Sequence, residues 1–424
     1  MQPLVIGRII GRKIFDSRGN PTVEVEATVQ DESGAVVGSG RAAAPSGASR
    51  GKHEVVAFPE GGVDVSLEKI RELASKLAGL GAGAQEEVDA ACREFDGTSD
   101  LHEVGGNAVV AVSMAVAKAV ASAAGVPLYK HLGGKQGAWL PYPLGNVLGG
   151  GKHAGRAAPD IQEFLVLPVG AKSFELAASA NAEVHKRVRK LIEMKDKSFT
   201  GGKGDEGAWA PNLGDRDALE IISRSCEEIS DEVGFKVRPA LDVAASSLYD
   251  EGGKKYVYER EGEQRDAGEQ VEFILDLIDA YGLVYAEDPI QEDDFESFAE
   301  ITRKVGKNCI TCGDDLFVTN VKRIKRGVEA EAANAVLIKP NQVGTLTDTQ
   351  KAVKLSKENN YVPVMSHRSG ETPDDTIAHL AVGFGCPIIK TGVVGGERVA
   401  KLNELIRIEE ELGDRARMGE LPCR

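Results

Sequence analysis

Six polar residues that can do chemistry stand at the ends of apolar runs in the second half of the chain. Each residue lies at or next to the end of its run. The runs PALD, LVYAED, CITCGDD, VLIK, VPVMSH and PIIK contain, in order, Asp242, Glu287, Asp314, Lys339, His367 and Lys390. The stretch AVLIKPN at 335–341 shows the pattern most clearly, because four buried-type residues run into a lysine and a proline. Proline cannot donate a ladder hydrogen bond, so the predicted strand ends there. A charge at the end of a core strand belongs either to a surface loop or to a functional site.

The three acids Asp242, Glu287 and Asp314 end three successive predicted strands. Carboxylate oxygens without cysteine or histidine ligands nearby suit Mg²⁺ better than zinc. One such acid alone would more often cap a helix or bind loop amides. Three in succession, facing two lysines, favour a metal site.

The two lysines Lys339 and Lys390 end predicted strands that lie two positions apart in the same sheet. Burial and neighbouring cations both disfavour an ammonium, so we expect the lysine pKa to fall toward the range of a general base. Either lysine alone would more often be a salt-bridge partner. The loop SHRSGET (366–372) adds Arg368 and Ser369, which together predict a grip for phosphate or carboxylate.

The spacing of these strand-end residues predicts a barrel. The intervals between residues 242, 287, 314, 339, 367 and 390 are 45, 27, 25, 28 and 23 residues. A strand, a helix and two short loops need about this length, so each interval after the first is one βα unit. Candidate strands at 142–148 and 164–168 bring the number to eight, which closes a TIM-type (β/α)₈ barrel. We therefore predict an α/β fold with this barrel as the catalytic domain over 136–424.

The first part of the chain predicts a separate α+β domain over 1–135. The segment PTVEVEATVQ (21–30) alternates apolar and polar residues, as a half-buried antiparallel strand does. With LVIGRIIGRKIF before it and AVVGSGRAA after it, the segment predicts a three-stranded meander. Helical patterns follow at 66–80, 84–95 and 107–124.

Composition and charge restrict the partners. The chain has 424 residues and a formal charge of 51 − 66 = −15, which disfavours nucleic acid or an anionic membrane as partner. The apolar segment 108–124 is broken by Lys118 and is short for a membrane span, so we expect a buried helix. The opening MQPLVIGRIIGRK lacks a basic region followed by a long apolar run, so we expect no secretory signal there.

Six scattered cysteines suggest reduced thiols and a cytoplasmic protein. The pair Cys309 and Cys312 lies in a strand-like run, where residues three apart face opposite sides, and this disfavours a redox or zinc motif.

Two glycine-rich stretches, GGGKHAG (149–155) and GGKGDEGAWAPN (201–212), match neither a Walker nor a Rossmann pattern. This removes the simplest nucleotide-binding hypotheses. Glu206, in the second stretch, has small neighbours that would let it approach a substrate closely. Taken alone, it would be read as a solvated loop acid.

The motifs together resemble one family, enolase (phosphopyruvate hydratase). The resemblance rests on FDSRGNPTVEVE, PSGASRGKHE, HAG and QEF at 153–164, GDEG and APN at 204–212, ALDVAAS, EDP and EDD at 287–294, GDDLFVTN, IKPNQVGTL, SHRSGET, IKTG and RIEEELG. These motifs run in order over nearly the whole chain.

The resemblance implies a reaction and a set of roles. The reaction is the reversible dehydration of 2-phosphoglycerate to phosphoenolpyruvate in glycolysis and gluconeogenesis, with two Mg²⁺ ions in each active site. The implied metal ligands are Asp242, Glu287, Asp314 and, in the SGAS loop, Ser49. The implied catalytic residues are Lys339 as base and Glu206 as acid, with Glu163 and His367 beside it. The implied substrate contacts are Arg368 and Ser369 for phosphate, Lys390 for carboxylate, and His153, Gln162 and Glu163 in the pocket wall.

Two alternatives stay open from the sequence. One is a related acid-sugar dehydratase or racemase, although such enzymes have no phosphate for SHRSGET and the SGAS loop to bind. The other is a non-catalytic binding protein on the same scaffold. The resemblance also implies a homodimer or a homo-octamer.

Overall fold

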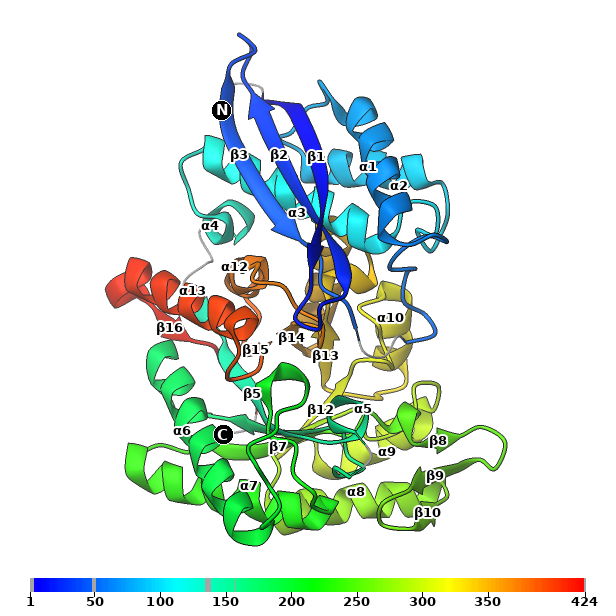
Figure 1. The fold of residues 1–424 in the computed structure, drawn as a ribbon, viewed down its shortest axis with the longest axis vertical. Coiled ribbons are helices and arrows are strands. Elements are labelled where there is room, and N and C mark those ends of the chain that lie inside the picture. The colour runs from blue at the N-terminus through cyan, green and yellow to red at the C-terminus, as the bar shows by residue number, and fades with distance from the viewer. Residues whose placement is uncertain (1–3, 48–50, 134–138, 156, 423–424) are drawn as a thin grey trace.

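The computed structural model describes residues 4–47, 51–133, 139–155 and 157–422. It places an N-terminal α+β domain against a β/α barrel, as Figure 1 shows with the first domain at the top. Both predicted architectures are confirmed.

The N-terminal domain is built on the predicted meander. Its antiparallel strands lie in the order β1 (Val5–Phe15), β2 (Pro21–Gln30) and β3 (Val36–Ala43). The alternation in β2 is confirmed, because Val23, Val25, Ala27 and Val29 are fully buried while the glutamates between them are partly exposed. Its helices are α1 (Val63–Leu77), α2 (Gln85–Asp96), α3 (Gly106–Ala123) and α4 (Leu128–Gly133).

Helix α3 packs directly on the sheet because both partners present small residues. A Cβ on Gly40 of β3 would lie 2.3 Å from the carbonyl oxygen of Ala115, and one on Gly38 would lie 2.3 Å from that of Ala119. Glycine at these positions is therefore required by the close approach. By length and composition α3 could cross a membrane, but 83% of it is buried inside the protein, as expected of a core helix.

The eight barrel strands close in chain order. They are β5 (Tyr142–Gly149), β6 (Glu163–Leu167), β7 (Arg238–Asp242), β11 (Tyr285–Glu287), β12 (Ile310–Gly313), β13 (Ala335–Ile338), β14 (Val362–Ser366) and β15 (Ile388–Lys390), which pairs back to β5. The surrounding helices are α6 (Phe174–Lys195), α7 (Asp215–Val233), α8 (Ala267–Tyr281), α9 (Phe295–Val305), α10 (Val321–Glu329), α11 (Leu346–Glu358), α12 (Thr376–Gly383) and α13 (Gly396–Leu412).

Short elements complete the fold. Helix α5 (Gly151–Ala154) follows β5, and β4 (Trp139–Leu140) pairs with β16 (Arg417–Met418). Strands β8 (Tyr249–Asp250), β9 (Lys255–Tyr258) and β10 (Glu263–Arg265) form a small outer sheet.

One barrel strand runs against the others. Strand β6 is antiparallel to both β5 and β7, whereas the remaining pairs in the barrel are parallel. Reversal places the first residue of β6, Glu163, opposite the last residue of β7, Asp242. The rim that collects the carboxyl ends of seven strands therefore also receives Glu163 from the amino end of the eighth.

Barrel packing explains why the chemistry lies at the rim. Alternate strand residues fill the interior with apolar side chains, including Leu144, Leu165, Ala240, Tyr285, Ile310, Leu337, Val364 and Ile388. Cys309 and Cys312 are both fully buried, as expected from a structural role. A filled interior leaves the strand ends as the place where polar groups can meet.

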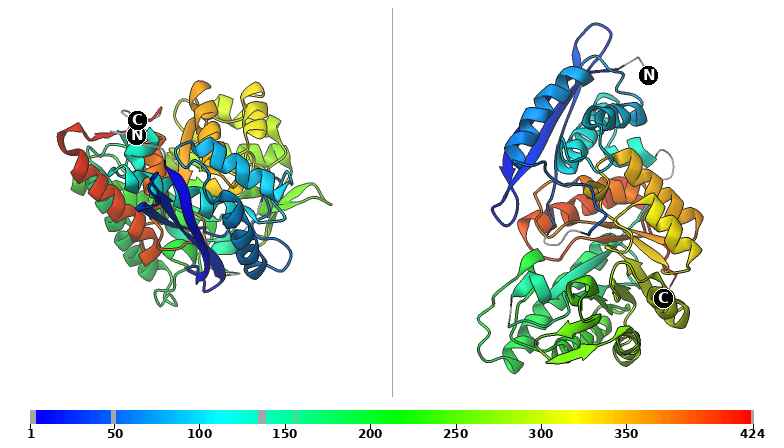
Figure 2. Two further views of the ribbon diagram at one scale, coloured as in Figure 1. Left: turned by 90° about the horizontal axis from the view of Figure 1, so that it is seen from above. Right: turned by 90° about the vertical axis from the view of Figure 1, so that its right-hand side faces the viewer.

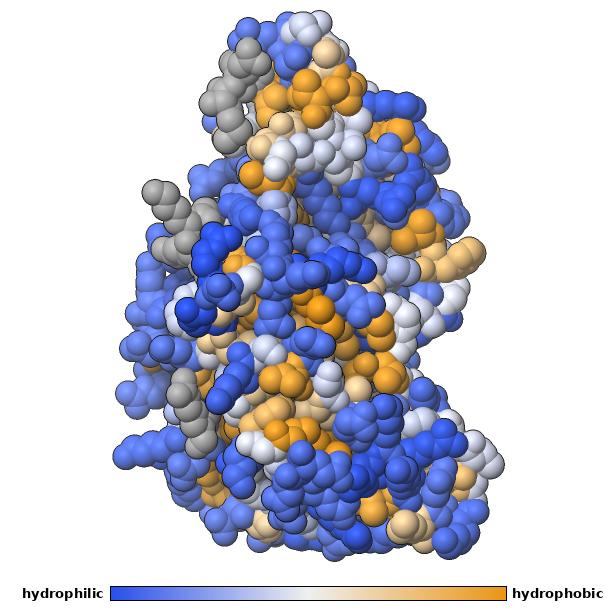
Figure 3. Space-filling model, turned by 90° about the vertical axis from the view of Figure 1, so that its left-hand side faces the viewer, coloured by the Kyte–Doolittle hydropathy of each residue, from blue (hydrophilic) through white to orange (hydrophobic). Residues whose placement is uncertain are grey.

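The N-terminal domain covers that rim, and in the right-hand view of Figure 2 it lies above the barrel. Ser46 and Gly370 exchange backbone hydrogen bonds of 2.7 and 2.8 Å. Arg93 of α2 donates to the Asp348 carboxylate at 2.7 Å and to the Val343 carbonyl at 2.6 Å. On the face drawn in Figure 3, apolar groups are interspersed with hydrophilic residues.

Candidate active site

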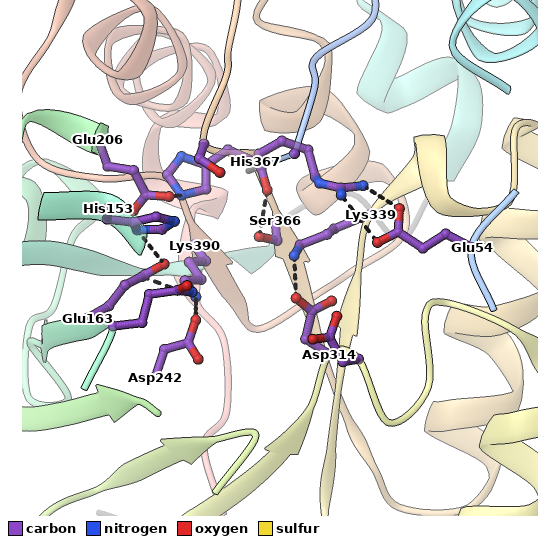
Figure 4. A pocket seen from close by; sticks show the side chains of 15 residues that line it. Glu54, His153, Glu163, Glu206, Asp242, Asp314, Lys339, Ser366, His367 and Lys390 are labelled. Atoms are coloured by element: carbon purple, nitrogen blue, oxygen red, sulfur yellow. Dashed lines mark hydrogen bonds and ion pairs between the residues drawn. The ribbon is translucent and has the colours of Figure 1, made fainter. Parts of the chain in front are cut away.

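One pocket at the rim gathers the predicted residues (Figure 4). It is a small pocket, and its lining consists almost entirely of polar and charged side chains. Its lining includes Glu54, His153, Gln162, Glu163, Glu206, Asp242, Asp314, Lys339, His367, Arg368, Ser369 and Lys390. Of the other predicted site residues, Glu287 lies fully buried beneath this lining, and Ser49 falls outside the described residues.

Lys390 joins three acids on one side of the pocket. Its Nζ lies 2.9 Å from the Asp242 carboxylate, 2.8 Å from Glu287 and 3.1 Å from Glu163. Asp242 and Glu287 are neighbours in register on β7 and β11. Burial, followed by the Asp242 charge, raises the pKa of Glu287 to about 8. Three carboxyl groups thus share one ammonium, and burial together with their crowding disfavours the ionised forms of Glu287 and Glu163.

Lys339 faces Asp314 on the other side of the pocket. The two form an ion pair, and the Gln342 amide donates to the same carboxylate at 3.0 Å. Asp288 holds the Asp314 segment from behind, because its carboxylate accepts the Asp314 N–H at 2.9 Å and the Asp315 N–H at 2.8 Å. Asp288 has a left-handed backbone, with φ of 38°.

The donor set fits a hard divalent cation. Among the described residues, the possible ligand atoms of Asp288, Asp314 and Asp315 lie within 4.8 Å of one another, as do those of His153, Glu163 and Glu206. The predicted ligands Asp242 and Glu287 belong to neither group, but both contact Lys390. Hard divalent cations such as Mg²⁺ prefer oxygen ligands, and these buried carboxylates can supply them.

The predicted pKa direction of the two lysines is wrong in this structure. Burial lowers the pKa of Lys339, but the carboxylates, Asp314 above all, outweigh it and raise the pKa. For Lys390, burial is outweighed in the same way by Asp242 and Glu163, and its pKa is also raised. The cause is the close approach of the acids to both ammonium groups, which strand spacing does not reveal.

A carboxylate and a histidine form a second centre beside the lysines. Glu206 accepts from the Asn146 amide at 3.1 Å and lies 3.2 Å from Nε2 of His367. His153 Nδ1 lies 3.5 Å from the Glu163 carboxylate. These side chains are all nearly inaccessible to solvent.

Glu163 and Glu206 differ in protonation although they share the pocket. Burial, together with the nearby Glu206 charge, raises the pKa of Glu163 well above its usual range. Burial acts the same way on Glu206, but His367, His153 and Arg398 outweigh it and hold the pKa of Glu206 well below its usual range. The two pKa shifts therefore favour the proton on Glu163 and the charge on Glu206.

Glycine neighbours allow Glu206 to reach this position. The backbone of Glu206 is left-handed, with φ of 64°. The residue lies within a short 3₁₀ helix, Asp205–Gly207. A Cβ on Gly204 would lie 2.1 Å from the carbonyl oxygen of His153. Only glycine fits at position 204, so this small neighbour lets the Glu206 turn lie close to His153.

The loop 366–372 brings Arg368 into the pocket. Its guanidinium donates twice to Glu54, at 2.9 and 3.2 Å, and once to Asn341 at 3.1 Å. Ser369 lines the same region, and the buried Gln162 Oε1 has no hydrogen-bond partner among the described residues. The Gln162 oxygen is thus placed to accept a hydrogen bond from a ligand.

Sequence reasoning missed four residues that position this centre, namely Asn146, Glu54, Asp288 and Arg398. Glu54 lies in PSGASRGKHE and Asp288 in EDP, so both were inside motifs already recognised. Asn146 was signalled only as a polar residue in the apolar run YPLGNVLG. Arg398 gave no signal beyond a basic residue in a helical pattern.

The fold and pocket define an enzyme class. A closed barrel whose rim holds buried acids, two lysines and a carboxylate–histidine pair suits acid–base chemistry on a small anionic substrate. Two family models match the chain, the enolase N-terminal domain over residues 6–132 and the enolase C-terminal TIM barrel domain over 137–420.

Curated relatives agree. Enolase of Methanothermobacter thermautotrophicus is 58% identical over 412 residues, covering 97% of each chain. Enolase of Methanosphaera stadtmanae is 58% identical over 402 residues, covering 95% of this chain and 96% of the relative. Enolase of Archaeoglobus fulgidus is 51% identical over 416 residues, covering 98% and 99%. This chain belongs to the enolase family, whose members are lyases (phosphopyruvate hydratases).

Proposed function

We propose that the rim pocket catalyses the reversible dehydration of 2-phospho-D-glycerate to phosphoenolpyruvate. The observation that carries this proposal is the division of the pocket, with Lys339 on one side and the pair Glu206 and His367 on another (Figure 4). Removal of a proton at carbon 2 and loss of hydroxide at carbon 3 need a base and an acid in different places.

Lys339 is the proposed base. A proton beside a carboxylate is very weakly acidic, because its removal adds a second negative charge to the same group. Lys339 is held by Asp314, which is also a proposed metal ligand. Once the charges of Asp314 and Glu287 are engaged elsewhere, burial and the cations Arg368 and Lys390 would lower the pKa of Lys339 toward that of a base.

Glu206 is the proposed acid for the departing hydroxide. Its lowered pKa favours the ionised form, so Glu206 must gain a proton before it can act as an acid, and the raised pKa of Glu163 makes that neighbour the proposed source. We propose that Glu163 supplies this proton and that His367 orients Glu206 through Nε2. Both glutamates are buried, which keeps bulk water from competing for the proton.

The remaining residues bind substrate and metal. Arg368 and Ser369 are proposed to bind the phosphate, and Lys390 the carboxylate. His153 and Gln162 are proposed to line the pocket. Asp242, Glu287 and Asp314 would hold one Mg²⁺, and Ser49 would contribute to a second. Bound Mg²⁺ supplies positive charge that stabilises the doubly charged carboxylate.

The first test is the growth of phosphoenolpyruvate absorbance when 2-phosphoglycerate and Mg²⁺ are added. Two variants then separate the roles. Lys339→Ala should abolish both turnover and exchange of the carbon 2 proton with heavy water. Glu206→Gln should lower turnover by about 10²–10⁴-fold, typical of an acid–base group, while exchange continues faster than turnover.

The reverse pattern would overturn the assignment. If Lys339→Ala still exchanged the carbon 2 proton and Glu206→Gln did not, the two residues would have opposite roles. Arg216→Ala is a matched control, because Arg216 forms an exposed ion pair with Asp276 and should leave both rates unchanged.

We also propose a cytoplasmic protein that assembles as a homodimer or homo-octamer, which sedimentation would distinguish. The proposed domain boundary at 135/136 falls between the two family matches, within residues 134–138 that lie outside the described part of the chain. Limited proteolysis at this segment, releasing a barrel fragment, would support it.

A further inference from the structure

A fully buried arginine lies behind the loop that carries His367. Arg398, near the start of α13, has no exposed surface. Its Nη1 lies 2.6 Å from Nδ1 of His367 and donates to the Arg368 carbonyl at 2.7 Å, while Nη2 donates to the Ser369 carbonyl at 2.6 Å. One side chain thus contacts three consecutive residues of the candidate site.

The contact with His367 determines where that ring carries its proton. A guanidinium has only donors and stays charged, so the Nδ1 atom facing it must offer a lone pair. In the neutral ring the proton is then on Nε2, which lies 3.2 Å from the Glu206 carboxylate. The other charged group near the ring is Glu371, and burial lowers the pKa of His367 to about 4.

We propose that Arg398 is a positioning residue that fixes His367 as the Nε2–H tautomer and so directs an N–H at Glu206. His367 then presents an N–H to the Glu206 carboxylate 3.2 Å away and cannot accept a proton at Nε2. The consequence for catalysis rests on the proposed role of Glu206, whereas the tautomer does not.

A second buried cation on α13 provides a matched control. Lys401, one turn further along, donates to the Glu371 carboxylate at 2.8 Å and to the Thr372 carbonyl at 2.6 Å. Lys401 also supports the loop 366–372, but these hydrogen bonds go to Glu371 and Thr372 and not to His367. If Arg398 were only a brace for the loop, removing either cation would affect the site in the same way.

The test is ¹⁵N NMR of the protein with labelled histidine imidazoles, with His367 among the 7 histidines identified by its loss in His367→Gln. We expect the wild-type ring to be protonated on Nε2 and bare on Nδ1 at neutral pH. Arg398→Met should shift the ring toward the Nδ1–H form, Arg398→Lys should restore Nε2–H at least in part, and Lys401→Met should leave it unchanged.

Kinetics give a second readout. Arg398→Met should lower turnover by about 10–100-fold, the usual range for a residue that orients another, with carbon 2 proton exchange less affected. A wild-type ring with its proton on Nδ1 would overturn the proposal even if Arg398→Met failed to fold. So would an Arg398→Met protein that keeps the Nε2–H tautomer. Because the tautomer is measured without substrate, failure of the proposed function would leave this result standing.

Discussion

At the scale of single residues, the pocket separates like groups by their surroundings. Glu163 and Glu206 are both buried, yet Glu206 accepts a hydrogen bond from the Asn146 amide and has His367 beside it, whereas Glu163 lies beside Lys390 among other acids. The position of Arg368 is also fixed by its surroundings, because Glu54 and Asn341 hold its guanidinium in place before any ligand binds. A preorganised cation loses little freedom when it binds an anion.

Arg368→Ala should therefore raise the KM for 2-phosphoglycerate. A hydrogen bond between charged groups is worth about 1.5–3 kcal/mol, so we expect an increase of about 10–100-fold. Initial rates over a range of substrate concentrations would measure it. An unchanged KM would mean that phosphate binds elsewhere.

At the scale of elements, close packing rather than propensity positions the functional loops. Helix α6 supports the Glu206 turn, because His185 lies 3.0 Å from the Gly207 carbonyl and stacks on Trp209 at 4.5 Å between ring centres. The Trp209 indole N–H in turn donates to the His185 carbonyl at 2.8 Å.

This arrangement predicts a pH dependence of stability. Burial lowers the pKa of His185 to about 4, below its usual value near 6.5. The unfolded chain therefore binds a proton at a higher pH than the folded protein does. Stability should fall as the pH drops from about 6.5 to about 4, by about 3 kcal/mol from this residue. The free energy of unfolding, measured with denaturant across this pH range, should depend less steeply on pH in His185→Gln than in the wild type. An identical slope would contradict the assignment.

The contact between β3 and α3 gives a second prediction for elements. Gly40→Ala would place a Cβ 2.3 Å from the Ala115 carbonyl, so the helix must shift. We expect a loss of about 1–3 kcal/mol, typical of overpacking, seen as a lower midpoint of thermal unfolding. Gly83→Ala is the control, since nothing lies within 4 Å of its added Cβ. Equal midpoints for the two variants would show that the sheet and helix can separate at little cost.

At the scale of the whole molecule, the excess of buried acids at the rim couples metal binding to stability. Mg²⁺ at 100 times its dissociation constant should stabilise the folded protein by about 2.7 kcal/mol if the unfolded chain does not bind it. We expect chelation to lower both activity and the midpoint of thermal unfolding, and Mg²⁺ to restore both.

Asp314→Asn should raise the Mg²⁺ concentration needed for half of this effect, because one ligand charge is lost. Asp89→Asn is the control, since Asp89 is a buried acid in α2 that accepts the Thr347 N–H at 2.9 Å. Full activity after exhaustive chelation would refute the metal assignment.

The sequence by itself determined the elements and the strand-end residues. Period-two alternation predicted β2, and the repeat of apolar runs with regular spacing predicted the barrel and placed Asp242, Lys339 and Lys390 at one rim. These features are local, since each depends on a single segment and its neighbours in the chain. Strand and helix boundaries agree within a few residues.

The tertiary structure alone decided orientation and pairing. The reversal of β6, the bond between Arg398 and His367, and the raised pKa values of both lysines join segments far apart in the chain. Charge interactions depend on distance in space and on burial, and neither can be read from sequence spacing. The types of the reactive groups were therefore predictable, whereas their protonation and mutual positions were set only when the barrel closed.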